Sequence, residues 1–184
     1  MSSRYKVSEN DVPHFITTTV IHWIDALSRP LYKDIILDSL SFCQQKKGLQ
    51  LHAWVIMNNH VHLIISAREG SQIADIVRDF KKFTSRKLID AILNNAQESR
   101  RNWMMRMFRS AGTSNSSNEQ FQFWEQNFHP IELDTEEKFR QRMNYLHENP
   151  VKAGFVWEAQ QYKYSSATDY YERRPGLLPL IMIE

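Results

Sequence analysis

The stretch Trp54-Val-Ile-Met-Asn-Asn-His-Val-His-Leu-Ile-Ile-Ser66 decides the fold of this 184-residue chain. Two apolar segments of strand length flank Asn58-Asn59, and asparagine tolerates the positive φ values that a tight hairpin needs. Side chains alternate along a strand, so His60 and His62 share one face while the apolar residues around them take the other. The stretch therefore predicts a β-hairpin whose second strand presents two histidines side by side.

These two histidines allow two interpretations. Imidazole is the commonest metal ligand in proteins, and two imidazoles at adjacent positions on one face can bind one divalent ion. A bare His-x-His pair is otherwise an ordinary surface or hydrogen-bonded pair. From these residues alone, the second interpretation is favoured.

Composition bounds the class of protein. The hydrophobic fraction of 42% and the charged fraction of 24% are typical of one globular domain, residues 1–184. Cys43 is the only cysteine, which excludes an internal disulfide and fits a reducing compartment. The first residues lack the apolar segment of a secretory signal, and no apolar run approaches the ~18 residues of a membrane span. We therefore expect a cytoplasmic protein with no membrane partner.

Positive charge is concentrated in one part of the sequence. The formal net charge of the chain is only +2, but residues 78–109 contain nine Lys or Arg and three Asp or Glu. Such a segment indicates a polyanion partner, although a solvated helix face explains it equally well. If the partner is a nucleic acid, the residues expected to contact its phosphates are Arg78, Lys81, Lys82, Arg86, Lys87, Arg100 and Arg101.

Hydrophobic periodicity predicts the other elements. The expected strands are residues 14–24, 49–57, 60–67 and 121–133, the last with a break near Pro130. The expected helices begin near Leu31 and Ser71, with a basic one at 97–110 followed by a polar loop at 111–118. A further helix begins after an acidic N-cap at Asp134 and runs to about Glu148. The fold class is therefore α+β: a ferredoxin-like βαββαβ antiparallel sheet with helices on one face plus a C-terminal helix.

The C-terminal helix carries two polar residues on one stripe. Tyr145 and Asn149 are four positions apart, so they lie one above the other at the edge of the apolar face. On a structural interpretation, Tyr145 is a packing residue whose hydroxyl is hydrogen-bonded. Asn149 would then cap a new helical turn that begins at Pro150. Taken alone, these residues favour that structural interpretation.

Two blocks of the sequence resemble a known family. The block WVIMNNHVHLI, which begins at Trp54, resembles the His-hydrophobic-His motif of single-tyrosine HUH transposases. The block YLHENPVKAGFV, which begins at Tyr145, resembles the tyrosine helix of their REP-associated branch. Trp124 and Tyr164-Ser165-Ser166 also have counterparts there. The resemblance covers about residues 14–170 and departs at residues 96–120, a basic excursion longer than compact members carry.

The resemblance implies a DNA transposase. Tyr145 would be the catalytic nucleophile, forming a 5′-phosphotyrosine, while His60, His62 and Asn149 would bind Mg²⁺ or Mn²⁺. The substrate would be single-stranded DNA beside a hairpin, and the protein would be a monomer or a homodimer. Three aromatic residues are candidates for stacking on unpaired bases: Trp103, Tyr170 and Tyr171.

Two other functions share parts of this pattern. A non-catalytic protein that binds hairpin DNA would keep the fold without cutting, but the joint presence of two histidines, a tyrosine and an asparagine argues against it. A replication initiator or relaxase also has the His-hydrophobic-His strand. In relaxases the tyrosine lies near the N-terminus, where Tyr5 is the only candidate.

Overall fold

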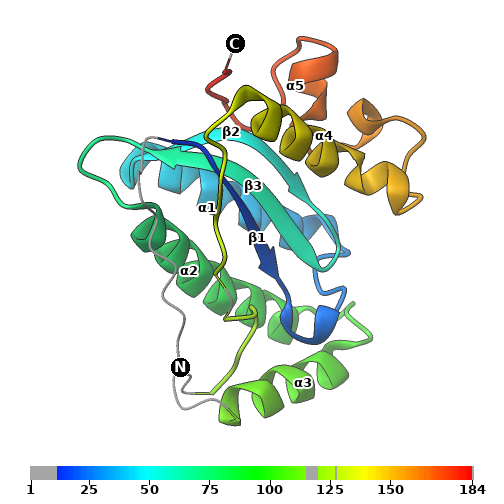
Figure 1. Ribbon diagram of the computed structural model, residues 1–184. Helices are drawn as coiled ribbons and strands as arrows, with labels where there is room; N and C mark the ends of the chain where they lie inside the picture. The colour runs from blue at the N-terminus through cyan, green and yellow to red at the C-terminus, as the bar shows by residue number, and fades with distance from the viewer. Residues whose placement is uncertain (1–11, 115–119, 127, 184) are drawn as a thin grey trace.

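The computed structural model describes residues 12–114, 120–126 and 128–183. Four strands form one antiparallel sheet: β1 (His14–Thr19), β2 (Leu49–Ile56), β3 (His60–Ala67) and β4 (Ile131–Glu132). Their spatial order is β2-β3-β1-β4, so β1 and β3 are central (Figure 1). This is the order that a βαββαβ chain makes when its two halves interleave, and the predicted fold class is confirmed.

Helices cover both faces of the sheet (Figure 1). On one face, α1 (Pro30–Lys46) and α2 (Ile73–Asn94) pack their apolar stripes against residues such as Leu51, Val61 and Ile65. On the opposite face, α4 (Glu136–Lys152) covers a smaller apolar cluster that includes Ala53 and Ile64. The remaining helical elements are η1 (Ile21–Trp23), α3 (Arg101–Thr113), η2 (Ala159–Gln161) and α5 (Ala167–Tyr171). No helix among the described residues is long and apolar enough to cross a membrane.

The hairpin between β2 and β3 forms at the predicted place, but positive φ values at the two asparagines are not its cause. Neither Asn58 nor Asn59 has a positive φ. Instead, the carbonyl of Asn58 accepts a hydrogen bond from the Leu27 amide, and that of Asn59 accepts one from the Val20 amide, both at 2.8 Å. The connection that follows β1 therefore holds the turn, which a reading of local turn chemistry cannot detect.

Two predicted strands are shorter than expected. The chain leaves the sheet after Thr19, because the following residues turn into η1 rather than continuing to Ile24. The strand expected at 121–133 is reduced to the two residues of β4 and an isolated bridge between Trp124 and Val20. Pro130 has no amide hydrogen to donate to a ladder, so regular pairing starts only after it.

The boundaries of α3 and α4 also differ from expectation. The N-cap of α4 is Thr135 rather than Asp134, since the Thr135 hydroxyl accepts from the Lys138 amide at 3.2 Å. The helix continues through Pro150 to Lys152, so no new turn begins there. Helix α3 includes residues 111–113 of the predicted loop, while residues 115–118 lie outside the described part of the chain.

Candidate active site

The two histidines of β3 lie side by side on the sheet face that α4 covers. In the register of the sheet, His60 is opposite Thr19 and His62 is opposite Thr17 of β1. The centres of the two imidazole rings are 4.6 Å apart. The predicted juxtaposition is therefore confirmed. His62 is buried and His60 is half-buried.

Each imidazole is held through its Nδ1 atom. His60 Nδ1 lies 2.6 Å from Asn59 Oδ1, and an amide oxygen can only accept, so this nitrogen carries the proton. The Asn59 amide nitrogen faces the Trp23 carbonyl at 3.5 Å, in agreement with this orientation. His62 Nδ1 lies 2.8 Å from Thr17 Oγ1. Nε2 is therefore the ring nitrogen on each histidine that faces a ligand, while Asn59 and Thr17 hold the rings through Nδ1, as hydrogen-bond partners of metal-binding histidines usually do.

Burial keeps both imidazoles neutral. It lowers the pKa of His62 to about 3, with smaller contributions from His60 and from the positive charge of Arg142. Burial also lowers the pKa of His60, while a hydrogen bond with Asn149 opposes the shift. A neutral imidazole is the form that binds a metal ion, so near neutral pH no proton competes for the site.

Helix α4 brings the third predicted ligand to these histidines. The Asn149 amide nitrogen donates to the Tyr145 carbonyl at 2.9 Å, and the Asn149 side chain lies next to His60. The side chains of His60, His62 and Asn149 therefore lie together. Among the described residues, no group of three or more His, Cys, Asp or Glu side chains could hold a metal ion. A metal at this site would thus depend on the asparagine.

Tyr145 lies beside the histidines with its side chain accessible. Its ring centre is 5.5 Å from that of His62 and 6.0 Å from that of Phe15, and 42% of the residue is exposed. The ammonium group of Lys152 lies 5.6 Å from the centre of the same ring. The structure therefore brings together all four residues predicted for catalysis and metal binding, and adds a cation next to the tyrosine.

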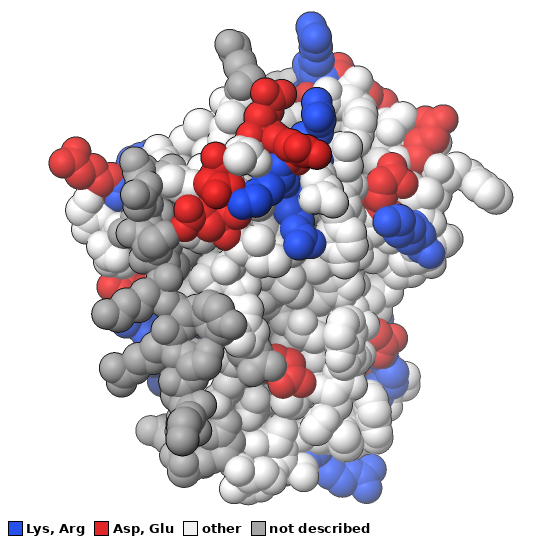
Figure 2. Space-filling model, in the orientation of Figure 1, with Lys and Arg blue, Asp and Glu red and all other residues white. Residues whose placement is uncertain are grey.

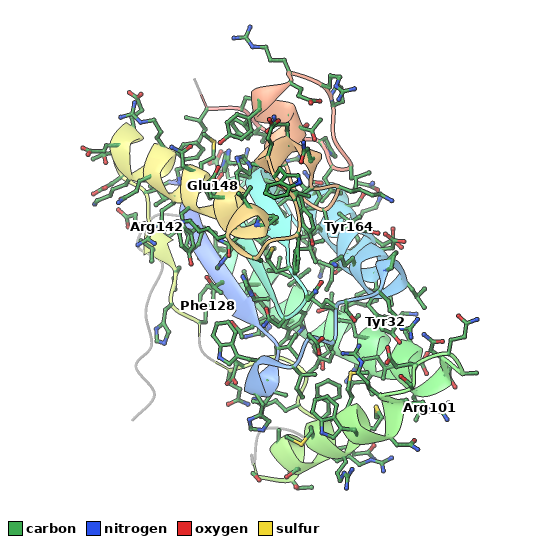
Figure 3. All side chains as sticks on the ribbon, turned by 90° about the vertical axis from the view of Figure 1, so that its right-hand side faces the viewer. Tyr32, Arg101, Phe128, Arg142, Glu148 and Tyr164 are labelled. Carbon is green, nitrogen blue, oxygen red and sulfur yellow. The ribbon has the colours of Figure 1, made fainter. Side chains whose placement is uncertain are left out.

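Arg142 is a further site residue, which sequence reasoning missed. It lies one turn before Tyr145 on α4, with its guanidinium 5.3 Å from the centre of the Phe15 ring on β1 (Figure 3). Among the described residues, no carboxylate forms an ion pair with it. Its donors are available to an anion at the site. Its three-residue spacing from Tyr145 is the signal that could have identified it.

A buried histidine fixes α4 to the sheet. The Nε2 atom of His147 lies 2.8 Å from the Ser166 hydroxyl, and that hydroxyl accepts from the Trp54 amide of β2 at 2.9 Å. The ring of Tyr170 packs on His147 at 5.3 Å, and its hydroxyl donates to the His52 carbonyl at 2.7 Å. The Tyr164-Ser165-Ser166 block thus includes the anchor of the tyrosine helix.

The predicted base-stacking residues lie in different surroundings. Tyr170 is occupied with internal packing, so it is not free to stack on a base. Tyr171 is half exposed, but its ring also contacts His147, at 5.6 Å between centres. Trp103 lies on α3 and is 42% exposed.

The basic residues of α2 lie along a separate groove. A cavity of about 950 Å³ runs between α2 and residues 120–126, and none of the predicted catalytic or metal-binding residues lines it. Lys82 and Arg86 are exposed at its side. Arg78 is already paired with Asp75 and Asp79.

The other predicted DNA contacts are engaged within the protein to different degrees. Lys81 donates to the Glu125 carbonyl, and burial lowers its pKa to about 8. Arg100 forms ion pairs with Glu98 at 3.1 Å and Asp25 at 2.7 Å. The remaining contacts are weaker: Lys87 lies over the Phe83 ring, and Arg101 donates to the Leu93 carbonyl at 3.4 Å.

The charges on the α4 side of the molecule are mixed. Figure 2 shows acidic and basic side chains together over α4 in the upper part of this face, and few charges in its middle. The sequence of α4 explains the mixture, since it contains Glu136, Glu137 and Glu148 as well as four basic residues. An anion at the site would therefore be bound by particular cations rather than by a broad positive surface.

Comparisons with known proteins agree with this fold. Residues 14–123 match the family model of IS200-like transposases. A solved REP-associated tyrosine transposase bound to a REP hairpin is similar in structure, with a TM-score of 0.66 and 15% sequence identity. The match covers 100% of this chain and 94% of that one. A putative transposase from Deinococcus radiodurans R1 gives a TM-score of 0.45 and 18% identity over 74% of this chain and 89% of that chain. No curated protein sequence matches the chain.

Proposed function

The chain belongs to the family of IS200-like transposases, and from this premise we propose that it cleaves and rejoins single-stranded DNA, with Tyr145 as the nucleophile and a divalent metal at His60, His62 and Asn149. One observation carries the proposal. The centre of the accessible Tyr145 ring lies 5.5 Å from that of His62, on the same helix whose Asn149 lies next to His60. A nucleophile and three candidate ligands therefore share one side of the sheet.

The residues present fit a divalent metal ion. Both imidazoles are neutral, both are held through Nδ1, and the Asn149 side chain lies beside His60. Nitrogen and oxygen donors suit Mg²⁺ and Mn²⁺, and Mn²⁺ accepts imidazole more readily. When bound, the ion would supply Lewis-acid polarisation of the phosphate oxygens at the cleavage site.

The nucleophilic step follows from the position of Tyr145. The Tyr145 hydroxyl releases its proton to water as its oxygen attacks the phosphorus, the bond from phosphorus to the 3′ oxygen breaks, and the departing 3′ oxygen takes up a proton from water. A 5′-phosphotyrosine remains. In the reverse step the 3′-hydroxyl of a strand attacks this linkage and restores the tyrosine. Because the linkage keeps the phosphodiester energy, rejoining needs no nucleotide, and the sequence contains no P-loop.

Two cations on α4 would assist this step. A phenol is largely un-ionised at neutral pH, and the Lys152 ammonium, 5.6 Å from the centre of the Tyr145 ring, stabilises the charge that develops on its oxygen. The Arg142 guanidinium has donors free for the non-bridging phosphate oxygens, since no carboxylate of the described chain pairs with it. Together they would hold and neutralise the phosphate under attack.

For the substrate, we propose single-stranded DNA next to a hairpin. The similar solved transposase is bound to a REP hairpin, and the exposed cations Lys82 and Arg86 line a groove where they can neutralise the phosphates of a DNA backbone. Cleavage at the α4 face and binding along α2 would then involve different parts of one substrate. The relaxase alternative would need Tyr5, which lies outside the described residues.

A strand-cleavage assay tests the proposal. Labelled oligonucleotides that carry a hairpin and a single-stranded flank are incubated with Mg²⁺, Mn²⁺ or a chelator. We expect cleavage only with metal, and we expect His60→Ala and His62→Ala to abolish it while hairpin binding persists. His129→Ala, which changes an exposed histidine that is not a proposed ligand, is the matched control. Undiminished cleavage by both site variants would refute the metal site, and binding without cleavage in any metal would favour a binding-only protein.

A further inference from the structure

Trp23 is an exposed aromatic residue at the edge of the candidate active site. It is 64% exposed, and its ring centre lies 5.9 Å from that of His60 in an edge-to-face arrangement. Tryptophans that serve packing in this protein are buried: Trp54 is 0% exposed and Trp124 is 4% exposed. Trp23 thus presents most of its indole to solvent next to a proposed metal ligand.

The backbone that carries this indole is strained. His22 and Trp23 have φ values of 55° and 57°, in the left-handed region that residues with a side chain rarely adopt. Two such residues in succession are unfavourable, and the surrounding structure must offset their cost.

Several hydrogen bonds hold the strained segment. The Trp23 amide donates to the Val20 carbonyl at 3.0 Å, and the His22 amide donates to the Glu125 carboxylate at 3.3 Å. The Trp23 carbonyl faces the amide nitrogen of Asn59, the residue that orients His60, at 3.5 Å. The segment is therefore tied to the residue that orients His60, and the backbone that carries the indole is held beside the site.

We propose that Trp23 is a stacking platform for an unpaired base next to the phosphate that is cleaved. The inference rests on the proposed function and deepens it, because it assigns the site a nucleotide position. Stacking on an aromatic ring needs an unpaired base and is worth roughly 1–3 kcal/mol per base. An ordered, open indole beside the histidines provides that surface without the loss of side-chain freedom that a mobile residue would incur.

The platform would determine which nucleotide of the strand lies at the site, and it would not select a particular base. Every base has a π-face, so stacking discriminates poorly between the four bases. It does fix where one nucleotide lies, and thereby which phosphate of the strand reaches His60, His62 and Tyr145. Loss of the ring should consequently weaken binding of the single-stranded flank and spread cleavage over neighbouring phosphates.

Binding measurements with abasic substrates test the platform. The oligonucleotides carry a hairpin and a single-stranded flank, and a single abasic site is moved along the flank one nucleotide at a time. For the wild-type protein we expect one position at which affinity falls roughly 5- to 100-fold. Trp23→Ala should bind the intact DNA more weakly by a similar factor and lose nothing further at that position. Trp23→Phe should keep most of the effect.

Two further variants separate stacking from a structural role. Trp23→Gly removes the ring and relieves the strained φ, so its thermal midpoint should equal or exceed that of the wild type while its affinity falls. Trp157→Ala removes another exposed tryptophan, 91% exposed, and should keep the position-specific loss. The platform is refuted if Trp23→Ala binds and cleaves like the wild type, or if it still shows the abasic effect. Because the scan measures binding only, absence of cleavage by the wild-type protein would count against the proposed function and not against the platform.

Discussion

Each histidine of the site depends on a neighbour that is not itself a proposed ligand. Asn59 fixes the tautomer of His60, and Thr17 holds the ring of His62 from the adjacent strand. The alternation of side chains along a strand was enough to predict that the two histidines share a face. The support from Thr17 could not be predicted, because it depends on the pairing of β1 with β3 across 45 positions of sequence. Arg142 could have been found from its three-residue spacing from Tyr145, whereas no sequence signal marks Trp23, whose place beside His60 depends on the fold.

At the residue scale, we predict that Thr17→Val weakens metal binding. Valine keeps the shape of threonine but cannot hydrogen-bond to His62 Nδ1, so the ring loses its fixed orientation. The affinity for Mn²⁺, measured by calorimetry, should fall roughly 10- to 100-fold. Thr18→Val is the matched control, because Thr18 pairs with Val61 and points to the other face of the sheet. Equal Mn²⁺ affinity in the Thr17 variant and the wild type would contradict the prediction.

At the scale of elements, α4 is the part of the molecule that assembles the site. It carries Arg142, Tyr145 and Asn149 on one side and the buried anchor His147 on another. The sequence indicated the helix and the shared stripe of Tyr145 and Asn149. It did not indicate where the helix lies, because that position depends on Ser166, which follows in a later segment and bonds to β2.

Because His147 is buried, we predict that the protein loses stability in acid. Burial lowers the pKa of His147 from 6.5 to about 4, so its stabilising effect is complete above pH 6.5 and is lost as pH falls toward 4. Between pH 7.5 and 5 this histidine alone should lower the free energy of unfolding by about 2 kcal/mol. Urea unfolding in the presence of a chelator measures the effect. His147→Gln, which cannot titrate, should show a flatter pH profile, and identical profiles in the two proteins would contradict the assignment.

From the exposed cations of α2, we predict how the affinity for DNA depends on salt concentration. Lys82 and Arg86 are exposed along the groove, so replacing either with Ala should lower the slope of log affinity against log salt by about 0.7–0.9. Arg78→Ala should lower it less, because Asp75 and Asp79 already neutralise its charge. Filter binding of a hairpin oligonucleotide at several salt concentrations provides the slopes. If all three variants keep the wild-type slope, this face of α2 is only solvated.

At the scale of the whole molecule, the sheet places the two histidines on a central strand and lets a later helix cover them. The order of strands and helices in the sequence was sufficient to predict this fold class. The order of elements did not predict how short β4 is. The Ile21 amide bonds to the Phe123 carbonyl outside the sheet, and Pro130 interrupts the strand, so only Ile131 and Glu132 remain in the ladder. The order of elements also does not show that the groove along α2 and the site beneath α4 lie in different places. Charge and family resemblance connect both regions with DNA but do not locate them in the fold.

The arrangement of the whole chain predicts that one molecule forms a complete site. Tyr145 lies 5.5 Å from His62 of its own chain, so the nucleophile need not come from a partner. A mixture of Tyr145→Phe and His62→Ala proteins should therefore cleave no better than either variant alone. Recovery of cleavage in the mixture would show that the tyrosine helix serves the histidines of another copy.

The central claim is that Tyr145 becomes covalently joined to DNA, and trapping that adduct tests it most directly. The protein is incubated with a labelled single-stranded substrate and Mn²⁺, denatured, and digested for mass spectrometry. We predict an adduct that survives denaturant and maps to Tyr145, and its loss in Tyr145→Phe, which keeps the ring and its contacts with His62 and Phe15. A Tyr145→Phe protein that still cleaves, or an adduct on any other residue, would contradict the account.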